Sequence, residues 1–204
     1  MRVGIVTDGQ GEVEAHPKLL AGLQPEGVTT AGIAYADLQP KASPGQIVKA
    51  AESRIRIFRA KGTAAVVLAI DLEDRRECAG QFARSLEAAF AARGMDCVRV
   101  AVKHRCLENW LLADVGALRS LAARFRVPKI LSRKISPNKA DHVQRPVELL
   151  QRMAVRKSYH KRRDPPDIMA AQDASVVARN SRSFRRFLRL LGHRAYREQS
   201  RQPA

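Results

Sequence analysis

The chain has 204 residues, 45% of them hydrophobic, which suffices for one globular domain with its own core. No stretch of about 18 apolar residues occurs, so a membrane-spanning helix is excluded. The first residues lack a basic region and a small-residue cleavage site, so they are not typical of a signal peptide. We therefore expect a cytoplasmic protein whose three cysteines, Cys78, Cys97 and Cys106, are reduced and mostly buried.

The net charge of +17 is concentrated in the second half of the chain. Residues 1–102 contain 13 basic and 12 acidic residues, a net charge of +1, whereas residues 103–204 contain 24 and 8, a net charge of +16. Such a surface favours DNA or RNA, because each phosphate that it neutralises releases condensed counterions. A solvated surface, or one that docks on an acidic protein, is the alternative interpretation.

The first half of the chain alternates between strand and helix patterns. Apolar runs predict four strands, at residues 3–6, 27–36, 64–70 and 97–102. Periodic segments predict the helices between them, at residues 13–23, 46–60 and 75–93. The alternation predicts an α/β fold with a mostly parallel sheet that helices cover on both faces. In such sheets, ligands bind beyond the carboxyl ends of the strands.

The second half is predicted to be basic and mainly helical. Helical patterns occur at residues 106–125, 147–153, 174–180 and 183–191. The connecting segments are a Pro-containing basic loop at 127–146 and the tract RKSYHKRRDPPD at 156–167, and the tail REQSRQPA is expected to fray. We therefore divide the chain into an α/β core, residues 1–125, and a basic helical extension, residues 126–204, that packs on it.

Acidic residues follow the first and third predicted strands. Asp8 and Glu12 lie in a Gly-rich turn, and Asp71 and Glu73 lie two apart at the end of an apolar run. Residues two apart on an extended chain point the same way, and neighbouring parallel strands would bring the two pairs together. Four close carboxylates repel one another unless a cation lies between them. Their oxygens suit Mg²⁺ or Mn²⁺, which can activate water and stabilise the leaving oxygen of a phosphodiester.

These acids also allow a structural interpretation. Asp71, Glu73, Asp74 and Glu77 lie near the start of a predicted helix. There, carboxylates cap free N–H groups and interact favourably with the helix dipole. Spacing alone leaves both interpretations open.

Several short motifs resemble a known family. VGIVTDGQGEVE at 3–14 and VVLAIDLEDR at 66–75 resemble the two acidic signatures of Toprim domains, which occur in topoisomerases, primases and OLD-type nucleases. LENWLLAD at 107–114, KSYHK at 157–161 and SRSF at 181–184 are similar to segments of a small bacterial Toprim-like family, the domain-of-unknown-function family numbered four-two-seven-six.

The resemblance implies a Toprim-like, Rossmann-like fold and a metal-dependent nuclease, in the manner of effectors of bacterial anti-phage systems. It also implies an ATPase partner protein, and it leaves a homo-oligomer open. In the family pattern a Glu stands at the position of Asp8 and an Asp at that of Glu73. Shifts of about an ångström in a catalytic group can lower a rate about 10²-fold. A catalytically degenerate nucleic-acid-binding module and an interaction subunit of an ATPase-containing complex are therefore alternatives.

Further residues complete the predicted site. Glu108 follows the fourth strand and is a candidate catalytic acid together with Asp8, Glu12, Asp71 and Glu73. Its structural alternative is a salt bridge to Lys103 or Arg105. Asp114 is interpreted as a helix cap and Trp110 as a core anchor.

Basic side chains interleaved with an aromatic suit phosphate contacts and base stacking. The residues predicted to bind nucleic acid are Arg156, Lys157, Tyr159, Lys161, Arg162, Arg163, Arg182, Arg185 and Arg186. The alternative for the 156–163 tract is a flexible basic loop. Signatures of zinc sites, phosphate loops, dinucleotide folds and nucleophile elbows are missing from the sequence.

Overall fold

The computed structural model describes residues 1–21, 23 and 27–196. Among these residues, four strands form an all-parallel sheet in the order β2-β1-β3-β4. The strands are β1 (Arg2–Thr7), β2 (Thr29–Tyr35), β3 (Ala65–Asp71) and β4 (Val98–Lys103). The predicted α/β class and the four predicted strands are thereby confirmed. The tail REQSRQPA, predicted to fray, lies outside the described residues.

Helices connect the strands and make up most of the second half. The crossover helices are α1 (Gln10–Leu20), α2 (Pro44–Ala60) and α3 (Ala79–Ala91). The later helices are α4 (Leu107–Ala113), α5 (Val115–Ser120), α6 (Leu131–Ile135), α7 (Pro146–Met153), α8 (Asp164–Ala171), α9 (Ala174–Asn180) and α10 (Arg182–Leu190). Two short 3-10 helices are η1 (Ala140–His142) and η2 (Arg194–Tyr196).

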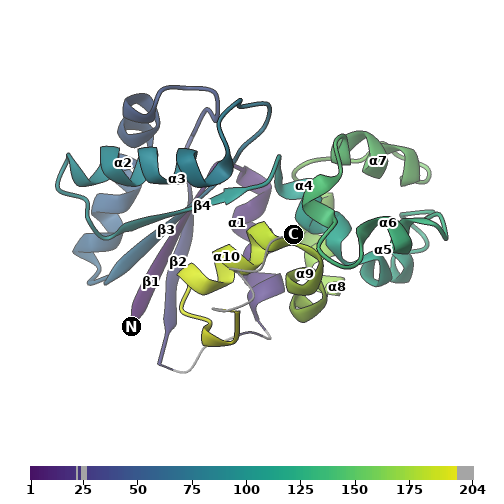
Figure 1. The fold of residues 1–204 in the computed structure, drawn as a ribbon. Coiled ribbons are helices and arrows are strands. Elements are labelled where there is room, and N and C mark those ends of the chain that lie inside the picture. Colours follow the sequence, from purple (N-terminus) through teal and green to yellow (C-terminus); the bar gives the residue numbers. More distant parts are fainter. Residues whose placement is uncertain (22, 24–26, 197–204) are drawn as a thin grey trace.

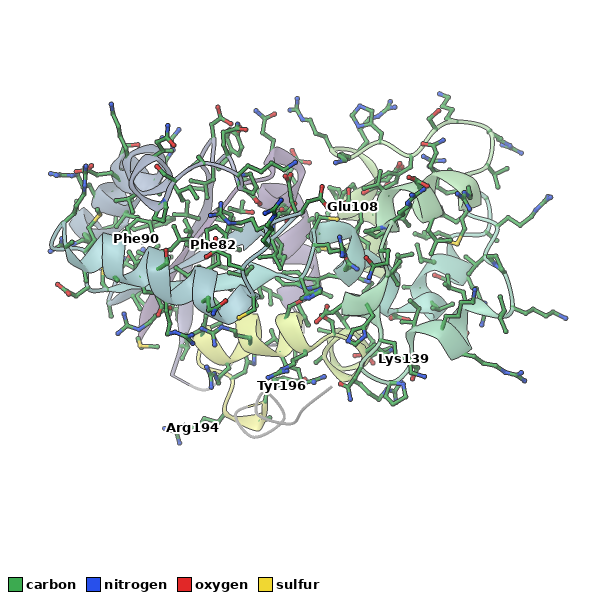
Figure 2. All side chains as sticks on the ribbon, turned by 45° about the horizontal axis from the view of Figure 1, so that its top comes forward. Phe82, Phe90, Glu108, Lys139, Arg194 and Tyr196 are labelled. Carbon is green, nitrogen blue, oxygen red and sulfur yellow. The ribbon has the colours of Figure 1, made fainter. Side chains whose placement is uncertain are left out.

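Helices cover both faces of the sheet (Figure 1), with α2 and α3 on one face and α1 and α10 on the other. Successive strand residues point to opposite faces. In β3, Val66 and Leu68 therefore pack in the cluster of α2 and α3, whereas Val67 and Ala69 pack in that of α1 and α10. Phe82 and Phe90 of α3 (Figure 2) are fully buried in the first cluster.

The helices after residue 125 share their hydrophobic core with the sheet. Ile168 of α8 and Phe187 of α10 belong to the same buried cluster as Ile5 of β1. Trp110 is completely buried in this cluster and donates a hydrogen bond from Nε1 to Ser183 Oγ at 2.7 Å, which confirms its predicted role as a core anchor. The predicted cap role of Asp114 is also confirmed, because its Oδ1 accepts from Ala117 N at 3.1 Å at the start of α5.

Two α-helices lie in segments that were predicted to be connecting loops. Helix α6 interrupts the Pro-containing loop at 127–146. Helix α8 begins at Asp164, inside the tract at 156–167, and includes Pro165 and Pro166 in its first turn. Proline is tolerated there because the first N–H groups of a helix have no intrahelical acceptor. Helix α8 packs along α1, and the end of the basic tract accordingly lies against the start of α1.

Cys78, Cys97 and Cys106 are free thiols, as predicted. Cys78 is exposed and the other two are half-buried, so the prediction of mostly buried thiols was wrong. In the part of the chain that the structure describes, no helix has both the length and the apolar character needed to cross a membrane.

Candidate metal centre

The turn after β1 brings Glu12 back towards the end of that strand. Gly9 is the extended N-cap residue of α1, so Glu12 lies in the first turn of the helix. A Cβ atom on Gly9 would lie only 2.7 Å from Glu12 Oε1. The glycine therefore leaves the space that the Glu12 carboxylate occupies.

Asp8, Glu12 and Asp71 converge on the ammonium group of Lys103. Lys103 Nζ donates to Asp8 Oδ1 at 2.6 Å and to Glu12 Oε1, and it lies 3.0 Å from Asp71 Oδ1. Asp71 and Lys103 are the last paired residues of β3 and β4. The backbone N–H of Asp71 donates to Asp8 Oδ2 at 2.7 Å, so the end of β3 is hydrogen-bonded directly to the turn after β1.

Burial is deepest at Lys103 and least at Asp71. The Lys103 side chain is fully buried, those of Glu12 and Asp8 are 3% and 5% exposed, and that of Asp71 is 20% exposed. The cluster therefore opens to solvent at Asp71.

Two further side chains fix the Glu12 carboxylate. Thr7 Oγ1 donates to Glu12 Oε2, and His16 Nε2 lies 2.9 Å from the same oxygen. His16 is fully buried on the next turn of α1, with its ring 5.3 Å from that of Phe187. Among the described residues its Nδ1 has no hydrogen-bond partner. Glu12 is thus held from both the strand and the helix.

The carboxylates differ in their affinity for protons. Burial raises the pKa of Asp8 to about 6, although Lys103 opposes this shift. Burial and the nearby Asp8 carboxylate raise the pKa of Asp71 well above its usual range. Burial would also raise the pKa of Glu12, but Lys103 and His16 together lower it to about 2.

The ammonium group of Lys103 stays charged in this setting. Burial alone would lower its pKa, but Asp71, Asp8 and Glu12 hold that pKa well above the usual range. One ammonium cannot neutralise three ionised carboxylates. The cluster therefore has spare affinity for positive charge, which protons or a cation can satisfy.

The three carboxylates fit a divalent metal ion. Asp8, Glu12 and Asp71 each offer an oxygen, and these oxygens lie within 4.8 Å of one another. Among the described residues, the buried Asp71 Oδ1 accepts no hydrogen bond in spite of its ion pair with Lys103. Carboxylate oxygens are the ligands that Mg²⁺ and Mn²⁺ prefer.

Glu73 does not join this group among the described residues. The strand ends at Asp71, and Glu73 adopts a left-handed conformation with φ of 49°. Its side chain is 40% exposed and lies 3.8 Å from Lys41 Nζ. The expectation that Asp71 and Glu73 continue one extended strand was therefore wrong.

The structural interpretation of the acids after β3 also receives no support from α3. This helix begins at Ala79 with Cys78 as its N-cap residue, and its first turn contains no acid. Glu77 instead pairs with Arg75 at 2.6 Å, and Asp74 lies 3.5 Å from Arg105.

Glu108 lies at the start of α4, where the sheet meets the helical half of the chain (Figure 2). It is 4% exposed and accepts a hydrogen bond from Tyr159 Oη at 3.1 Å. The proposed alternative of a salt bridge to Lys103 or Arg105 is not found among the described residues, because Lys103 pairs with the acidic cluster and Arg105 with Asp74.

The basic tract at 156–163 packs directly against the first turn of α1. A Cβ atom on Gly11 would lie 2.8 Å from the carbonyl oxygen of Lys161 and 2.9 Å from the Cα of Arg162. Gly11 precedes Glu12, so the tract borders the acidic cluster. Its exposed cations are Arg156, Lys157, Lys161, Arg162 and Arg163.

An ion pair that sequence reasoning missed holds this tract in place. Arg124 donates to both carboxylate oxygens of Asp164, at 2.9 and 2.6 Å. It also donates to the carbonyl oxygens of Lys157 at 2.7 Å and Ser158 at 2.8 Å. Nothing in the local sequence of Arg124 distinguishes it from the other arginines of this half.

Two residues predicted to contact nucleic acid are buried. The Tyr159 ring is 8% exposed and its hydroxyl is bound to Glu108, so it offers no stacking surface. Arg185 is 3% exposed and donates to the carbonyl oxygen of Ala178 at 2.5 Å. By contrast, Arg182 is exposed and Arg186 is half-buried. For Tyr159 and Arg185, the expectation of a surface role was wrong.

Lys103, Thr7 and His16 belong to the site but were not predicted as members. Lys103 had a detectable signal, because it ends the fourth apolar run as Asp71 ends the third. Carboxyl ends of parallel strands meet at one edge, so a polar residue there is a candidate site residue. His16 gave no comparable signal beyond its position four residues after Glu12.

Residues 8–192 match the family described as Domain of unknown function (DUF4276). The chain belongs to this family. The match begins at Asp8 of the acidic cluster and ends at Gly192, just beyond α10, so it covers most of the chain. The predicted membership in the domain-of-unknown-function family numbered four-two-seven-six is thereby confirmed. No curated protein and no solved structure shows a significant match to the chain.

Proposed function

We propose that this protein is a divalent-metal-dependent nuclease that hydrolyses phosphodiester bonds in the cytoplasm. The observation that carries the proposal is the convergence of Asp8, Glu12 and Asp71 at the carboxyl ends of adjacent parallel strands, with one Lys103 ammonium between them. A divalent cation would balance the remaining negative charge, and edges of this kind are where ligands bind in parallel sheets.

Each residue of the cluster has a distinct role in this proposal. Asp8, Glu12 and Asp71 would hold Mg²⁺ or Mn²⁺, which when bound supplies polarisation of the phosphodiester and activation of water. Lys103 keeps the carboxylates in place and supplies fixed positive charge near the phosphate. Thr7 and His16 orient Glu12 through its second oxygen. Asp71 is the most exposed of the three acids, so substrate would approach the metal ion from its side.

The substrate would be held by the basic tract beside the cluster. The backbone of Lys161 and Arg162 lies against Gly11, one residue before Glu12. The exposed cations of the tract would therefore lie close to the acidic cluster. They can neutralise phosphates on both sides of the scissile bond of a DNA or RNA strand.

We also propose a relation to the Toprim domains of OLD-type nucleases. Its support is the placement of the acidic signatures after β1 and β3, which are neighbours in the sheet. The helical half would then serve as a basic extension of a Toprim-like core. An ATPase partner and a role in anti-phage defence follow from the same relation.

A second candidate function is favoured by the position of Lys103. Its ammonium already contacts an oxygen of all three acids, and in this respect it stands where a metal ion would stand. If Lys103 takes the place of the metal ion in the acidic cluster, the protein would bind nucleic acid without cutting it. Its affinity would fall steeply with salt and would not change on removal of metal.

The experiment that decides between these functions is a cleavage assay. Labelled single- and double-stranded DNA and RNA are incubated with Mg²⁺ or Mn²⁺, and with EDTA. The variants are Asp71→Asn and its matched control Asp74→Asn, an exposed acid three residues later. We expect cleavage that requires metal, falls at least about 10²-fold in Asp71→Asn and is retained in Asp74→Asn. Binding without cleavage in either metal would instead support the second function.

Mn²⁺ titration by calorimetry provides a readout independent of activity. Wild type and Asp74→Asn should bind the ion, and Asp71→Asn should bind it more weakly. Equal Mn²⁺ affinity in Asp71→Asn and wild type would contradict the assignment of this carboxylate as a ligand.

A further inference from the structure

A second charged site lies between the start of α3 and helix α10. The two elements enclose a cavity of about 590 Å³ beside the end of β4. Its basic lining comes mainly from Arg182, Arg186 and Arg189 of α10. These residues are four and three positions apart, so they share one side of the helix.

The three arginines of α10 that line the cavity are not paired with acids of the described residues. Within the described residues they form no ion pair, and the buried Nε of Arg186 has no hydrogen-bond partner. Burial and the nearby Arg189 lower the pKa of the Arg186 guanidinium, with Arg84 and Arg182 adding to the repulsion and Glu87 opposing it. An anion in the cavity would relieve both the repulsion and the unmet hydrogen-bonding capacity.

The acids that line the cavity are already engaged. Glu77 forms an ion pair with Arg75 at 2.6 Å. Asp141 accepts from the hydroxyls of Ser181 and Ser183 at 2.7 and 3.0 Å and from the backbone N–H of Ser183 at 2.8 Å. Among the described residues, neither carboxylate forms an ion pair with the three cavity-lining arginines, so these acids do not balance the positive charge of the cavity.

The first turn of α3 supplies further anion-binding groups. Ala79 and Gly80 line the cavity and are the first two residues of this 13-residue helix. Their backbone N–H groups have no acceptor inside the helix, and the helix dipole is positive at this end. The cavity thus combines guanidinium groups with backbone donors, the set that recognises phosphate.

We propose that this cavity binds a phosphoryl group, separately from the acidic cluster. Val102 lines the cavity whereas Lys103 lies in the cluster, and successive strand residues point to opposite faces. The two sites therefore lie on the two sides of the end of β4. The phosphate belongs either to a nucleic-acid backbone or to a free phosphorylated compound. If the phosphate belongs to a nucleic-acid backbone, the inference rests on the proposed function. The nucleic-acid strand would then run from the acidic cluster round the edge of the sheet to the cavity.

Calorimetry with pyrophosphate tests the proposal on the full chain. EDTA excludes metal from the acidic cluster, and an ionic strength of about 0.15 M limits non-specific attraction. We expect binding that weakens roughly 10-fold to 100-fold in Arg186→Gln and in Arg189→Gln. The matched control is Arg126→Gln, which removes the same charge from an exposed position outside the cavity. It should keep the wild-type affinity, and so should Asp71→Asn.

Competition identifies the source of the phosphate. Displacement of labelled single-stranded DNA by pyrophosphate would assign the site to the backbone, and simultaneous binding would assign it to a free compound. No binding of pyrophosphate to the wild type, or an equal loss in Arg126→Gln, would overturn the proposal. If Arg186→Gln proves unfolded in a thermal melt, the exposed Arg182→Gln takes its place. Because pyrophosphate binding is measured without metal, its outcome is independent of whether the acidic cluster cleaves nucleic acid.

Discussion

Asp71 and Lys103 face each other across the last residue pair of β3 and β4, with Lys103 Nζ 3.0 Å from Asp71 Oδ1. This pair joins the sheet ladder to the acidic cluster, because the same ammonium also contacts Asp8 and Glu12. The register of two parallel strands thus sets the geometry of the candidate metal centre. It also makes Lys103 the residue whose removal should matter most.

Replacing Lys103 by Met should destabilise the metal-free protein by about 3–5 kcal/mol, because three buried carboxylates would lose their common partner. Added Mg²⁺ should restore part of this stability, since the ion can take the place of the ammonium. Urea unfolding with EDTA or Mg²⁺ measures both effects. Lys41→Met, at a position 67% exposed, should stay within about 0.5 kcal/mol of wild type. A Lys103→Met protein as stable as wild type in EDTA would contradict the buried ion-pair network.

The stability of the metal-free protein should depend on pH through Glu12 and Asp8 in opposite directions. The pKa of Glu12 is lowered from 4.5 to about 2, so the unfolded chain binds more protons in that window and stability rises with pH. The pKa of Asp8 is raised from 3.8 to about 6, so the native state binds more protons there and stability falls as pH rises. Asp71, whose pKa is also raised, acts in the same direction as Asp8. Urea midpoints in EDTA from pH 3 to pH 8 should therefore pass through a maximum at about pH 4 and fall above it.

Asp8→Asn should reduce the fall in stability between about pH 4 and pH 6, because the amide does not titrate and only the contribution of Asp71, whose pKa is also raised, remains. The exposed Asp96→Asn should leave the profile unchanged. If Asp8→Asn and wild type gave the same profile, the raised pKa of Asp8 would be refuted.

Binding of a divalent cation should release protons. Asp8 and Asp71 have raised pKa values in the metal-free site, and a cation between them favours their ionised forms. Mn²⁺ affinity should therefore be higher at pH 8 than at pH 5.5. Calorimetry at about pH 6 in two buffers with different ionisation enthalpies counts the protons. A binding heat that is the same in both buffers would show that the carboxylates are already ionised.

Arg124→Lys should loosen the basic tract. The lysine keeps the charge but cannot bridge both oxygens of Asp164 and also reach the carbonyl oxygens of Lys157 and Ser158. We expect a loss of about 1–3 kcal/mol in unfolding free energy. Trypsin cleavage within 156–163 should quicken about tenfold for each 1.4 kcal/mol of local opening. Because trypsin cuts after both residue types, the variant keeps the cleavage site, and an unchanged pattern would argue against the anchoring role.

Tyr159→Phe should leave nucleic-acid binding unchanged, because the ring is buried and cannot stack on a base. It should cost about 1 kcal/mol through the lost hydrogen bond to Glu108. Tyr159→Ala should cost about 3–5 kcal/mol, since it also leaves a cavity. Fluorescence anisotropy with labelled DNA and urea unfolding separate the two effects. Weaker DNA binding by a fully folded Tyr159→Phe protein would restore the stacking role that the buried ring excludes.

Much of the fold can be predicted from local sequence patterns. The apolar runs at 64–70 and 97–102 correspond to β3 and β4, because continuous apolar segments rich in β-branched residues suit strands that are buried on both faces of a parallel sheet. The acids at the ends of β1 and β3 could be placed at one edge of the sheet, because the carboxyl ends of parallel strands meet there. Two local predictions failed. Glu73 does not continue the strand, which ends at Asp71, and α8 begins within the tract that was predicted to be a connecting segment.

Tertiary structure decided the composition of the cluster and the burial of the basic residues. Lys103 lies 95 residues from Asp8 in sequence, and they meet only because β3 lies between β1 and β4 in the sheet. Tyr159 and Arg185 carry the same local signal as their exposed neighbours, yet packing against Glu108 and the end of α9 buries them. Sequence alone determined that acidic residues follow the first and third strands, since the apolar runs of those strands end at Asp8 and Asp71. Which of them share one ion pair depends on sheet order and packing, which no local pattern encodes.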